Sequence, residues 1–423
     1  MTEVTSAPVP RLGARACVAI LLLAAALRVA ATAVVGFWTL GFGDARAYVF
    51  AARSLVETGR YPDSTDIYFF RAPGYPVFLV AATLGDPDRV ALAKLANIAL
   101  GSLSALLLAI LSARLFRRRD VAIATGLAAA VHPSFVLVAT EVQSEPLFLF
   151  FFLCSGLLLL SATDRPSSSQ ALLAGALLAL AALTRPSALT LFPLLCAPLL
   201  DRRHPKRARA HLAAAAFLGF AFALFPWTLR NALVFRALIP ISDATGYAFY
   251  VGNSDWHLRF HEITSRAEYE RWIAALDEDM ARQMEALDGA TRSSPTARSD
   301  YFFRRALSER MQDPWTWAYL LAQKAWDWIR PYPSRWFWPP WVVSGIGLYY
   351  TVLTVFAAIG LLRAERRGAA LFSLILLVVT MAAHVVLLVV WRYRVPYWDP
   401  VLLLYGTLGA GITLGRLWKR PAL

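Results

Sequence analysis

The distribution of apolar residues along the chain is the first feature that limits its structure. Long runs rich in Ala and Leu alternate with short polar segments that carry Arg and Pro, from about residue 16 to residue 415. A membrane-spanning helix needs roughly 20 mainly apolar residues, whereas the strands of a membrane barrel are short alternating segments. The pattern therefore predicts an all-α polytopic membrane protein.

The apolar runs predict ten transmembrane helices. They lie at about 16–38, 91–113, 121–137, 146–162, 170–184, 187–200, 212–229, 341–362, 369–390 and 398–415. The first run has no small-residue cleavage site after it and is longer than the apolar core of a signal peptide, which is about 7–15 residues. We therefore expect it to be a retained helix. The composition agrees, because 58% hydrophobic and 17% charged residues exclude an ordinary soluble protein.

Basic residues are distributed unequally between the two sides of this predicted bundle. With a cytoplasmic N-terminus, the cytoplasmic connections hold 18 Arg and Lys residues, and the short outer connections hold only Arg185, Arg392 and Arg394. Cytoplasmic loops of membrane proteins carry an excess of Arg and Lys. Both termini are therefore predicted to be cytoplasmic, in a cytoplasmic (inner) membrane. The net charge of +14 then reports topology rather than nucleic-acid binding.

Two predicted outer segments are too long to be turns and divide the chain. The first is the loop 39–90, within an N-terminal transmembrane module at 1–229. The second, 230–340, has no convincing span and is predicted to be a small helical region outside the membrane. The last part, 341–423, holds the C-terminal transmembrane helices.

The first outer loop is expected to contain two interfacial helices. Ala45 to Thr58 has apolar residues at helical spacing beside charged ones, which suits a helix lying on the membrane surface. Ala72 to Leu84 is apolar but too short to span, so it is predicted to be an interfacial or re-entrant helix. In the second segment, Glu262 to Ala286 is charged and amphipathic.

Asp44 is the candidate catalytic residue, because it places a carboxylate where the first span ends. Tyr48 follows at four residues, so the two side chains would share a helix face and both could contact a substrate. The alternative is structural, since Asp is favoured at a helix start, where its oxygen accepts from free amides.

Arg71 lies in the segment Phe69-Phe70-Arg71-Ala72-Pro73-Gly74-Tyr75-Pro76, directly before the second apolar helix of the loop. A cation there could hold a phosphate at the lipid surface. The alternative is that Arg71 only reaches out to lipid headgroups, and Pro73 is an ordinary helix start.

Glu141 and Glu145 stand at the connection between the third and fourth predicted spans, at a spacing that would put them on one helix face. Two carboxylates there could bind a sugar, a metal or a cationic acceptor. Alternatively, Ser144 and Glu145 before Pro146 only start the next helix.

Further arginines lie at the outer ends of predicted spans. Arg185 interrupts an apolar stretch, Arg230 ends the seventh span, and Arg392 and Arg394 follow the ninth. Each alone could be an interfacial anchor. Together with Arg71 they place several guanidinium groups on one side of the membrane, which suits a phosphate-linked lipid.

Other signals are weak or missing. Asp86-Pro87-Asp88 resembles a metal-binding D-x-D, and His257 and His261 would share a helix face but lack a third ligand, so no metal site and no cofactor are predicted. The three cysteines lie in apolar runs and suggest no disulfide framework. No nucleotide-binding or serine-hydrolase motif is present. Any chemistry would therefore use a preactivated substrate.

The order of these motifs resembles that of the C-type (GT-C) membrane glycosyltransferases, in the bacterial branch related to protein O-mannosyltransferases and lipid A aminoarabinose transferases (glycosyltransferase family 39). The resemblance is carried by the segments named above and by S-E-P-L-F, A-L-T-R-P-S-A-L, P-W-T-L-R-N, Gly252-Asn253 and R-Y-R-V-P, which begin at residues 144, 182, 226, 252 and 392. It spreads over most of the chain.

The resemblance implies a transferase that moves a sugar from a polyprenyl-phosphate donor, with inversion, to a lipid, glycan or protein acceptor on the outer face of the membrane. Asp44 would match the family's catalytic carboxylate. The residues expected near the donor phosphate are Arg71, Arg230, Arg392 and Arg394, and those expected near substrate are Tyr48, Tyr75, Glu141, Glu145, Arg185 and Asn253.

The chain departs from the family pattern at one point. Many relatives have Asp-Glu at the first-loop site, whereas Ala45 follows Asp44 here, so Glu145 would have to supply a second carboxylate. Two other function classes compete with the transferase. A lipid flippase or transporter would carry charged residues deep in several spans, and a non-catalytic membrane scaffold would need neither Asp44 nor Arg71.

Overall fold

The structure of the chain is a computed structural model, which describes residues 9–41, 44–62, 71–334 and 338–418, with side chains to residue 415. Within these residues the regular secondary structure is entirely helical. The predicted all-α fold is therefore confirmed. Part of the expected turn between the two loop helices, including Phe69 and Phe70, lies outside the described residues.

Six helices of the described chain are long and apolar enough to cross a membrane. They are α1 (Ala14–Val35), α4 (Val90–Phe116), α7 (Glu145–Asp164), α10 (Lys206–Phe235), α17 (Pro340–Arg363) and α18 (Arg367–Val386). A seventh is possible if α5 (Arg119–Val131) and α6 (Pro133–Ala139), which meet at a bend of 49°, form one broken span. The chain is thus a multi-pass membrane protein.

The other predicted spans are also helical. Over the residues that the structure describes, however, these helices are too short or not apolar enough to cross a membrane. They are α8 (Ser168–Thr184), η1 (Pro186–Cys196) with α9 (Ala197–Leu200), and α19 (Trp398–Trp418). In η1 the backbone winds as a 3-10 helix and contains Pro193. A 3-10 helix rises further per residue than an α-helix, and Pro removes a backbone donor. The number of spans by this test is therefore six or seven rather than ten.

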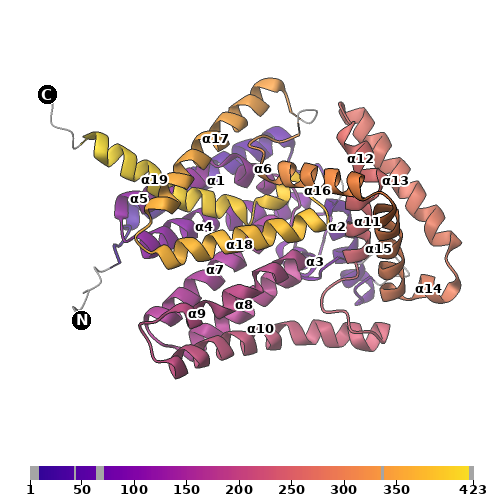
Figure 1. Cartoon of the computed structure of the whole chain (residues 1–423), viewed down its shortest axis with the longest axis horizontal. Coiled ribbons are helices and arrows are strands. Elements are labelled where there is room, and N and C mark those ends of the chain that lie inside the picture. Colours follow the sequence, from indigo (N-terminus) through magenta and orange to yellow (C-terminus); the bar gives the residue numbers. More distant parts are fainter. Residues whose placement is uncertain (1–8, 42–43, 63–70, 335–337, 419–423) are drawn as a thin grey trace.

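The remaining helices that the structure describes are not candidate spans. They are α2 (Asp44–Thr58), α3 (Gly74–Ala82), α11 (Thr245–Asn253), α12 (Asp255–His261), α13 (Arg266–Ala286), α14 (Gly289–Ser293), α15 (Pro295–Gln312), α16 (Pro314–Ile329) and η2 (Trp391–Arg394). Figure 1 shows α11 to α15 gathered at the end of the bundle opposite to both chain termini. The segment 230–340 thus supplies the predicted helical region, and α2 and α3 agree with the predicted loop helices.

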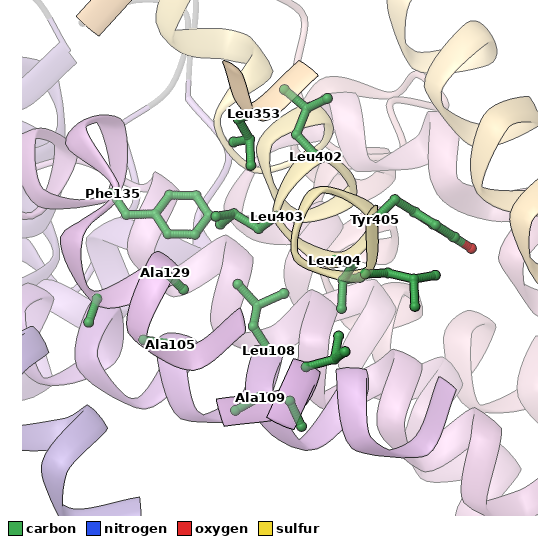
Figure 2. Close-up of a cluster of buried hydrophobic side chains, with 14 of the residues drawn as sticks. Ala105, Leu108, Ala109, Ala129, Phe135, Leu353, Leu402, Leu403, Leu404 and Tyr405 are labelled. Carbon is green, nitrogen blue, oxygen red and sulfur yellow. The ribbon is translucent and has the colours of Figure 1, made fainter. Parts of the chain in front are cut away.

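One core of the bundle is built around α19. Figure 2 shows Leu402, Leu403 and Leu404 of α19 among side chains from α4, α5, α6 and α17. Ala105 and Ala109 of α4 are fully buried in this cluster. Small side chains let helix backbones approach one another, which is how helices associate inside a lipid bilayer.

Large apolar side chains remain exposed on the outer faces of the spans. Examples are Leu22 on α1, Phe222 on α10, Leu348 on α17 and Val378 on α18. In water such faces would be costly, but lipid chains can cover them. The exposed apolar faces therefore agree with a bilayer-embedded bundle.

The two loop helices pack together and against the end of α8. Ala45 and Val49 of α2 belong to one buried cluster with Tyr75 and Leu79 of α3. A Cβ at Gly74, where α3 begins, would lie 2.8 Å from the backbone of residues 183 and 184. Only Gly permits this approach. This close approach of α3 to the end of α8 brings the segments that carry Asp44 and Arg71 near the segment that carries Arg185.

Candidate active site

Asp44 lies at the start of α2 between two arginines. Its Oδ1 is 2.8 Å from Nη2 of Arg71, and its Oδ2 pairs with Nη2 of Arg392. Arg71 precedes α3 and Arg392 belongs to η2, so three distant segments meet at this carboxylate. The Asp44 side chain keeps 15% of its surface exposed. Both oxygens are therefore committed to guanidinium groups, an arrangement that helix capping alone does not require.

A second carboxylate and a third arginine adjoin this cluster. Oε1 of Glu145 is 2.9 Å from Nη1 of Arg185 and 3.9 Å from Nε of Arg392. The same Nη1 of Arg185 donates to Oγ of Ser144 at 3.0 Å. The ring of Tyr393 lies against the guanidinium groups of both Arg185 and Arg392, at 5.3 and 5.7 Å from its centre. Arg392 thus joins the two carboxylates into one network.

The network carries more positive than negative charge. Arg71, Arg185 and Arg392 face Asp44 and Glu145, which leaves one positive charge in excess. Burial opposes ionisation of Asp44, but the three guanidinium groups, that of Arg71 foremost, hold the pKa of this carboxyl well below its usual range. The arginines in turn are held in the charged form, and the pKa of Arg71 is raised chiefly by Asp44. The site therefore suits an anionic ligand.

Tyr48 and Tyr75 pack together next to this network, which is called the ion cluster below and consists of Asp44, Arg71, Glu145, Arg185 and Arg392. The hydroxyl of Tyr48 is 3.0 Å from Oγ of Ser144, and its ring meets that of Tyr75 edge to face at 4.8 Å. Asn97 of α4 donates from Nδ2 to the Tyr75 hydroxyl at 2.8 Å and to the carbonyl oxygens of Glu141 and Gln143. Tyr75 is fully buried, which fits a role in positioning Tyr48, and its predicted contact with substrate stays a prediction.

Glu141 and Glu145 do not share a helix face as their spacing suggests. Helix α7 begins at Glu145, and Glu141 lies in the bend before it. Pro146 near the start of α7 fixes this boundary, because Pro is favoured in the first helical turn. Glu141 instead faces Lys94 of α4 at 3.7 Å. Its carboxylate is therefore neutralised by a different cation from those at Glu145.

Arg230 contacts the chain segment that leads to Arg71. Its Nη2 donates to the carbonyl oxygen of Tyr61 at 3.1 Å, and its guanidinium lies over the ring of Trp227. The hydroxyl of Tyr61 donates to the carbonyl oxygen of Arg71 at 2.9 Å. Arg230 thus supports the chain segment that carries Arg71.

Arg394 and Asn253 are buried and bonded to protein groups. The Arg394 side chain is 1% exposed, pairs with Asp399 at 3.2 Å and donates to the carbonyl oxygen of Arg330 at 2.9 Å. Asn253 is fully buried and accepts from Trp317 at 3.1 Å through Oδ1. These contacts fit structural roles, and donor phosphate binding by Arg394 and substrate binding by Asn253 stay predictions.

We expect loss of the Asp399 charge to destabilise the protein. Asp399→Asn leaves the buried guanidinium of Arg394 without a counter-charge, which typically costs about 3–5 kcal/mol. Thermal unfolding in detergent micelles should show a transition several degrees lower. Glu270→Gln is the matched control, because it breaks only the exposed pair of Glu270 with Arg266. An equal transition temperature for both variants would contradict a structural role for the Arg394 pair.

Helices of the 230–340 segment reach the ion cluster from the other side. Tyr247 of α11 is close enough for electrostatic interaction with Arg71, and Tyr269 of α13 with Arg392. Burial raises the pKa of Tyr247 to about 12, so its hydroxyl stays protonated and can donate. Helices α11 and α13 therefore each place a tyrosine near an arginine of the ion cluster.

The D-x-D sequence at Asp86-Pro87-Asp88 is engaged elsewhere. Asp86 pairs with Arg89 at 3.1 Å, and Asp88 pairs with Arg53 at 2.5 Å. These pairs link the start of α4 to α2. They fit a structural role and do not bring the two carboxylates to the ion cluster.

Three polar residues of the site escaped the sequence analysis. Gln143 accepts from Nη1 of Arg392 at 2.6 Å, while Lys94 and Asn97 hold the Glu141 segment. Gln143 lies between the two glutamates that were recognised, and Lys94 and Asn97 are polar residues in the first turns of an apolar helix. A polar residue in such a helix is a functional or structural signal that could have identified both.

Comparison with known proteins agrees with this geometry. Residues 76–227 match the family model of dolichyl-phosphate-mannose-protein mannosyltransferases. The archaeal oligosaccharyltransferase AglB from Archaeoglobus fulgidus, in complex with an inhibitory peptide and a dolichol-phosphate, superposes with a TM-score of 0.57 and 14% identity over 95% of this chain. The chain has the fold of the GT-C membrane glycosyltransferases. The predicted resemblance is thereby confirmed.

Other solved structures that match the chain are longer or less similar. A structure of the Archaeoglobus fulgidus enzyme with Zn and sulfate gives a TM-score of 0.56 at 13% identity, again over 95% of this chain. The chain spans about half the length of these oligosaccharyltransferases, 50% and 49%. ArnT from Cupriavidus metallidurans, bound to undecaprenyl phosphate, gives a TM-score of 0.40 at 16% identity over 92% of this chain and 78% of its own, too low to support an argument. No curated protein matches the sequence.

Proposed function

We propose that this GT-C chain is a glycosyltransferase that takes a sugar from a polyprenyl-phosphate donor and passes it to a lipid, glycan or protein acceptor. One observation carries the proposal. Asp44 is held between Arg71 and Arg392 in a partly exposed cluster with one positive charge in excess. Such a cluster can accept a phosphate and still present a carboxylate beside it.

The donor phosphate and Asp44 would compete for the same guanidinium groups. When the phosphate binds to Arg71 and Arg392, these arginines stabilise the leaving group as negative charge grows on it. The Asp44 carboxylate is then released from its strongest partners, and its pKa rises toward the ordinary range. Donor binding thereby converts a neutralised carboxylate into an available base.

Asp44 would act on the acceptor. A carboxyl group with an ordinary pKa of about 3.9 is too weak a base to ionise a hydroxyl beforehand. It can accept the proton while the new bond to the sugar forms, and a positioned base contributes on the order of 10²–10⁴ in rate. A single displacement, with the acceptor attacking opposite to the phosphate, inverts the anomeric carbon. The phosphate is already a good leaving group, so the proposed reaction uses no cofactor.

The donor class is also supported by a complex of a protein with the same fold. The AglB structure is in complex with an inhibitory peptide and a dolichol-phosphate. Apolar side chains exposed on the spans would accommodate the polyprenyl chain. Glu145 would supply the second carboxylate of the site, and it pairs with Arg185 at 2.9 Å.

The direct test of this function compares membrane glycolipids and secreted glycans of cells with the wild-type chain, without it, and with Asp44→Asn. A transferase should yield a glycosylated product only with the wild-type chain, and the lipid-linked sugar donor should accumulate in the other two. A transporter would require no catalytic carboxylate, so full product formation by the Asn variant would contradict a transferase that uses Asp44.

We expect the site to face outward, with both chain termini in the cytoplasm. Single cysteines at Ser293, in the 230–340 segment, and at Arg118, between α4 and α5, would report the two sides. Both replacements require a background without the three natural cysteines. An impermeant thiol reagent should label position 293 and not position 118 in intact cells. The reverse pattern would mean that the orientation is inverted.

A further inference from the structure

Two histidines and an aspartate meet in the 230–340 segment, outside the ion cluster. His257 and His261 are one turn apart on α12, and Asp327 comes from α16. Nε2 of His257 is 3.3 Å from Nε2 of His261, which is 3.4 Å from Oδ2 of Asp327. All three ligand atoms lie within 4.8 Å of one another. The sequence supplied the two histidines, and the fold supplies the third ligand from 66 residues further along the chain.

The two measured separations, 3.3 and 3.4 Å, match those between ligands of a small divalent ion. Zinc binds His nitrogen and carboxylate oxygen at about 2.0–2.2 Å in tetrahedral geometry. Two ligands at the corners of such a tetrahedron are then about 3.3–3.5 Å apart. Two imidazoles that direct the same ring nitrogen at each other need a shared proton or a shared cation between them. A cation satisfies both nitrogens and the carboxylate at once.

The neighbouring Lys324 is engaged by another residue. It lies one turn before Asp327 on α16, and its Nζ donates to Oδ1 of Asn253 at 2.8 Å.

Neighbouring residues orient the Asp327 carboxylate and leave a path for the ion to enter. Nε of Arg330 lies 3.2 Å from Oδ1 of Asp327, so Oδ2 is left for the ion. Partners of this kind fix the direction of a ligating carboxylate. The side chain of Asp327 is 7% exposed, whereas that of His261 is 23% exposed. An ion could thus enter past His261, and a water molecule could complete the tetrahedron from that side.

We propose that His257, His261 and Asp327 bind a divalent transition metal, with Zn²⁺ as the best fit, and that this ion ties α12 to α16. Imidazole and carboxylate ligands suit zinc better than calcium or magnesium, which prefer oxygen donors. The ion acts as a brace within the 230–340 segment and takes no part in the transfer reaction.

The proposed ion would stabilise the contacts that position Arg392. The carbonyl oxygen of Arg330, at the end of α16, accepts from Nε1 of Trp391 at 3.3 Å and from Nη1 of Arg394 at 2.9 Å. These residues flank Arg392 in η2. Gly252 lies in α11, three residues before α12 begins, and a Cβ there would lie 1.9 Å from the carbonyl oxygen of Leu387, in the chain before η2. An ion between α12 and α16 would therefore stabilise the Arg330 contact to η2 directly, and its α12 ligands lie close in sequence to the Gly252 contact.

The test uses the full-length chain purified without a polyhistidine tag, treated with a chelator and then titrated with Zn²⁺ against a chromophoric chelator. We expect one tightly bound Zn²⁺ per chain and a thermal transition that rises when Zn²⁺ is added, because a ligand that binds only the folded state stabilises it. His261→Ala and Asp327→Asn should each lower the affinity by at least about tenfold, the usual cost of losing one protein ligand or its partner.

The control is His211→Ala, which removes an exposed histidine of α10. It should bind Zn²⁺ as the wild type does. Asp327→Asn also removes the counter-charge of Arg330, so its metal-free thermal transition should be lower. His261→Ala leaves that pair intact, and its metal-free transition should stay close to that of the metal-free wild type, which shows that this variant is folded. Absence of Zn²⁺ binding by the wild type, or unchanged stoichiometry and affinity in both ligand variants, would overturn the proposal. Neither result depends on the transferase assay.

Discussion

Asp44→Asn should lower the turnover of a polyprenyl-phosphate sugar donor by at least about a hundredfold. The Asn side chain keeps the size of Asp and can still accept a hydrogen bond at a helix start, but it cannot take a proton from the acceptor. Donor turnover is measured as release of polyprenyl phosphate by purified protein in liposomes, at matched protein levels. The variant should remain folded and inserted in the membrane.

The matched control for Asp44→Asn is Asp88→Asn. Asp88 also pairs with an arginine, Arg53, but it lies away from the ion cluster. It should retain turnover close to that of the wild type, since an exposed ion pair contributes little. Wild-type turnover by the Asp44→Asn protein would return Asp44 to the role of a helix cap and leave the site without a base.

Arg71→Ala should impair donor turnover more strongly than Arg71→Lys. The guanidinium of Arg71 lies 2.8 Å from Asp44 and is placed to form charge-assisted hydrogen bonds to the donor phosphate. Lys keeps the positive charge but loses the paired donors of the guanidinium. Loss of a single donor to a developing negative charge typically costs on the order of 10²–10³ in turnover. Initial rates at several donor concentrations would separate weaker donor binding from slower transfer.

The control for Arg71 is Arg89→Ala, which removes another arginine of the same loop that pairs with Asp86. We expect this variant to turn over the donor at nearly the wild-type rate. Equal rates for the wild type, Arg71→Ala and Arg71→Lys would exclude Arg71 from the phosphate site.

The fold class was predictable because the bilayer imposes a simple rule on the sequence. A backbone inside lipid must satisfy its own hydrogen bonds, so long apolar runs become helices. Breaks within the runs were harder to place. The bend between α5 and α6 falls next to Pro133, and η1 contains Pro193. Proline signals a break, but the sequence does not fix whether the chain bends, changes helix type or leaves the membrane.

The candidate site was predictable as a set of residues but not as a set of contacts. Asp44, Arg71 and Arg392 each stood out as charged residues at the end of an apolar run, yet the pairing joins positions 348 residues apart. Such contacts follow from packing of the whole bundle. Arg392 and Arg394 illustrate the limit most clearly. They are two residues apart in η2, and a 3-10 helix turns them to different sides, one toward Asp44 and the other toward Asp399.

The affinity of the protein for polyprenyl monophosphate tests the central claim most directly, namely that the phosphate displaces Asp44 from Arg71 and Arg392. If the claim holds, Asp44→Asn removes the competitor and should tighten phosphate binding by roughly tenfold, equivalent to about 1.4 kcal/mol, while Arg392→Ala should weaken it. Binding can be measured by titration of the lipid into protein in nanodiscs. Phosphate binding that is unchanged or weaker in the Asp44→Asn protein would contradict the claim.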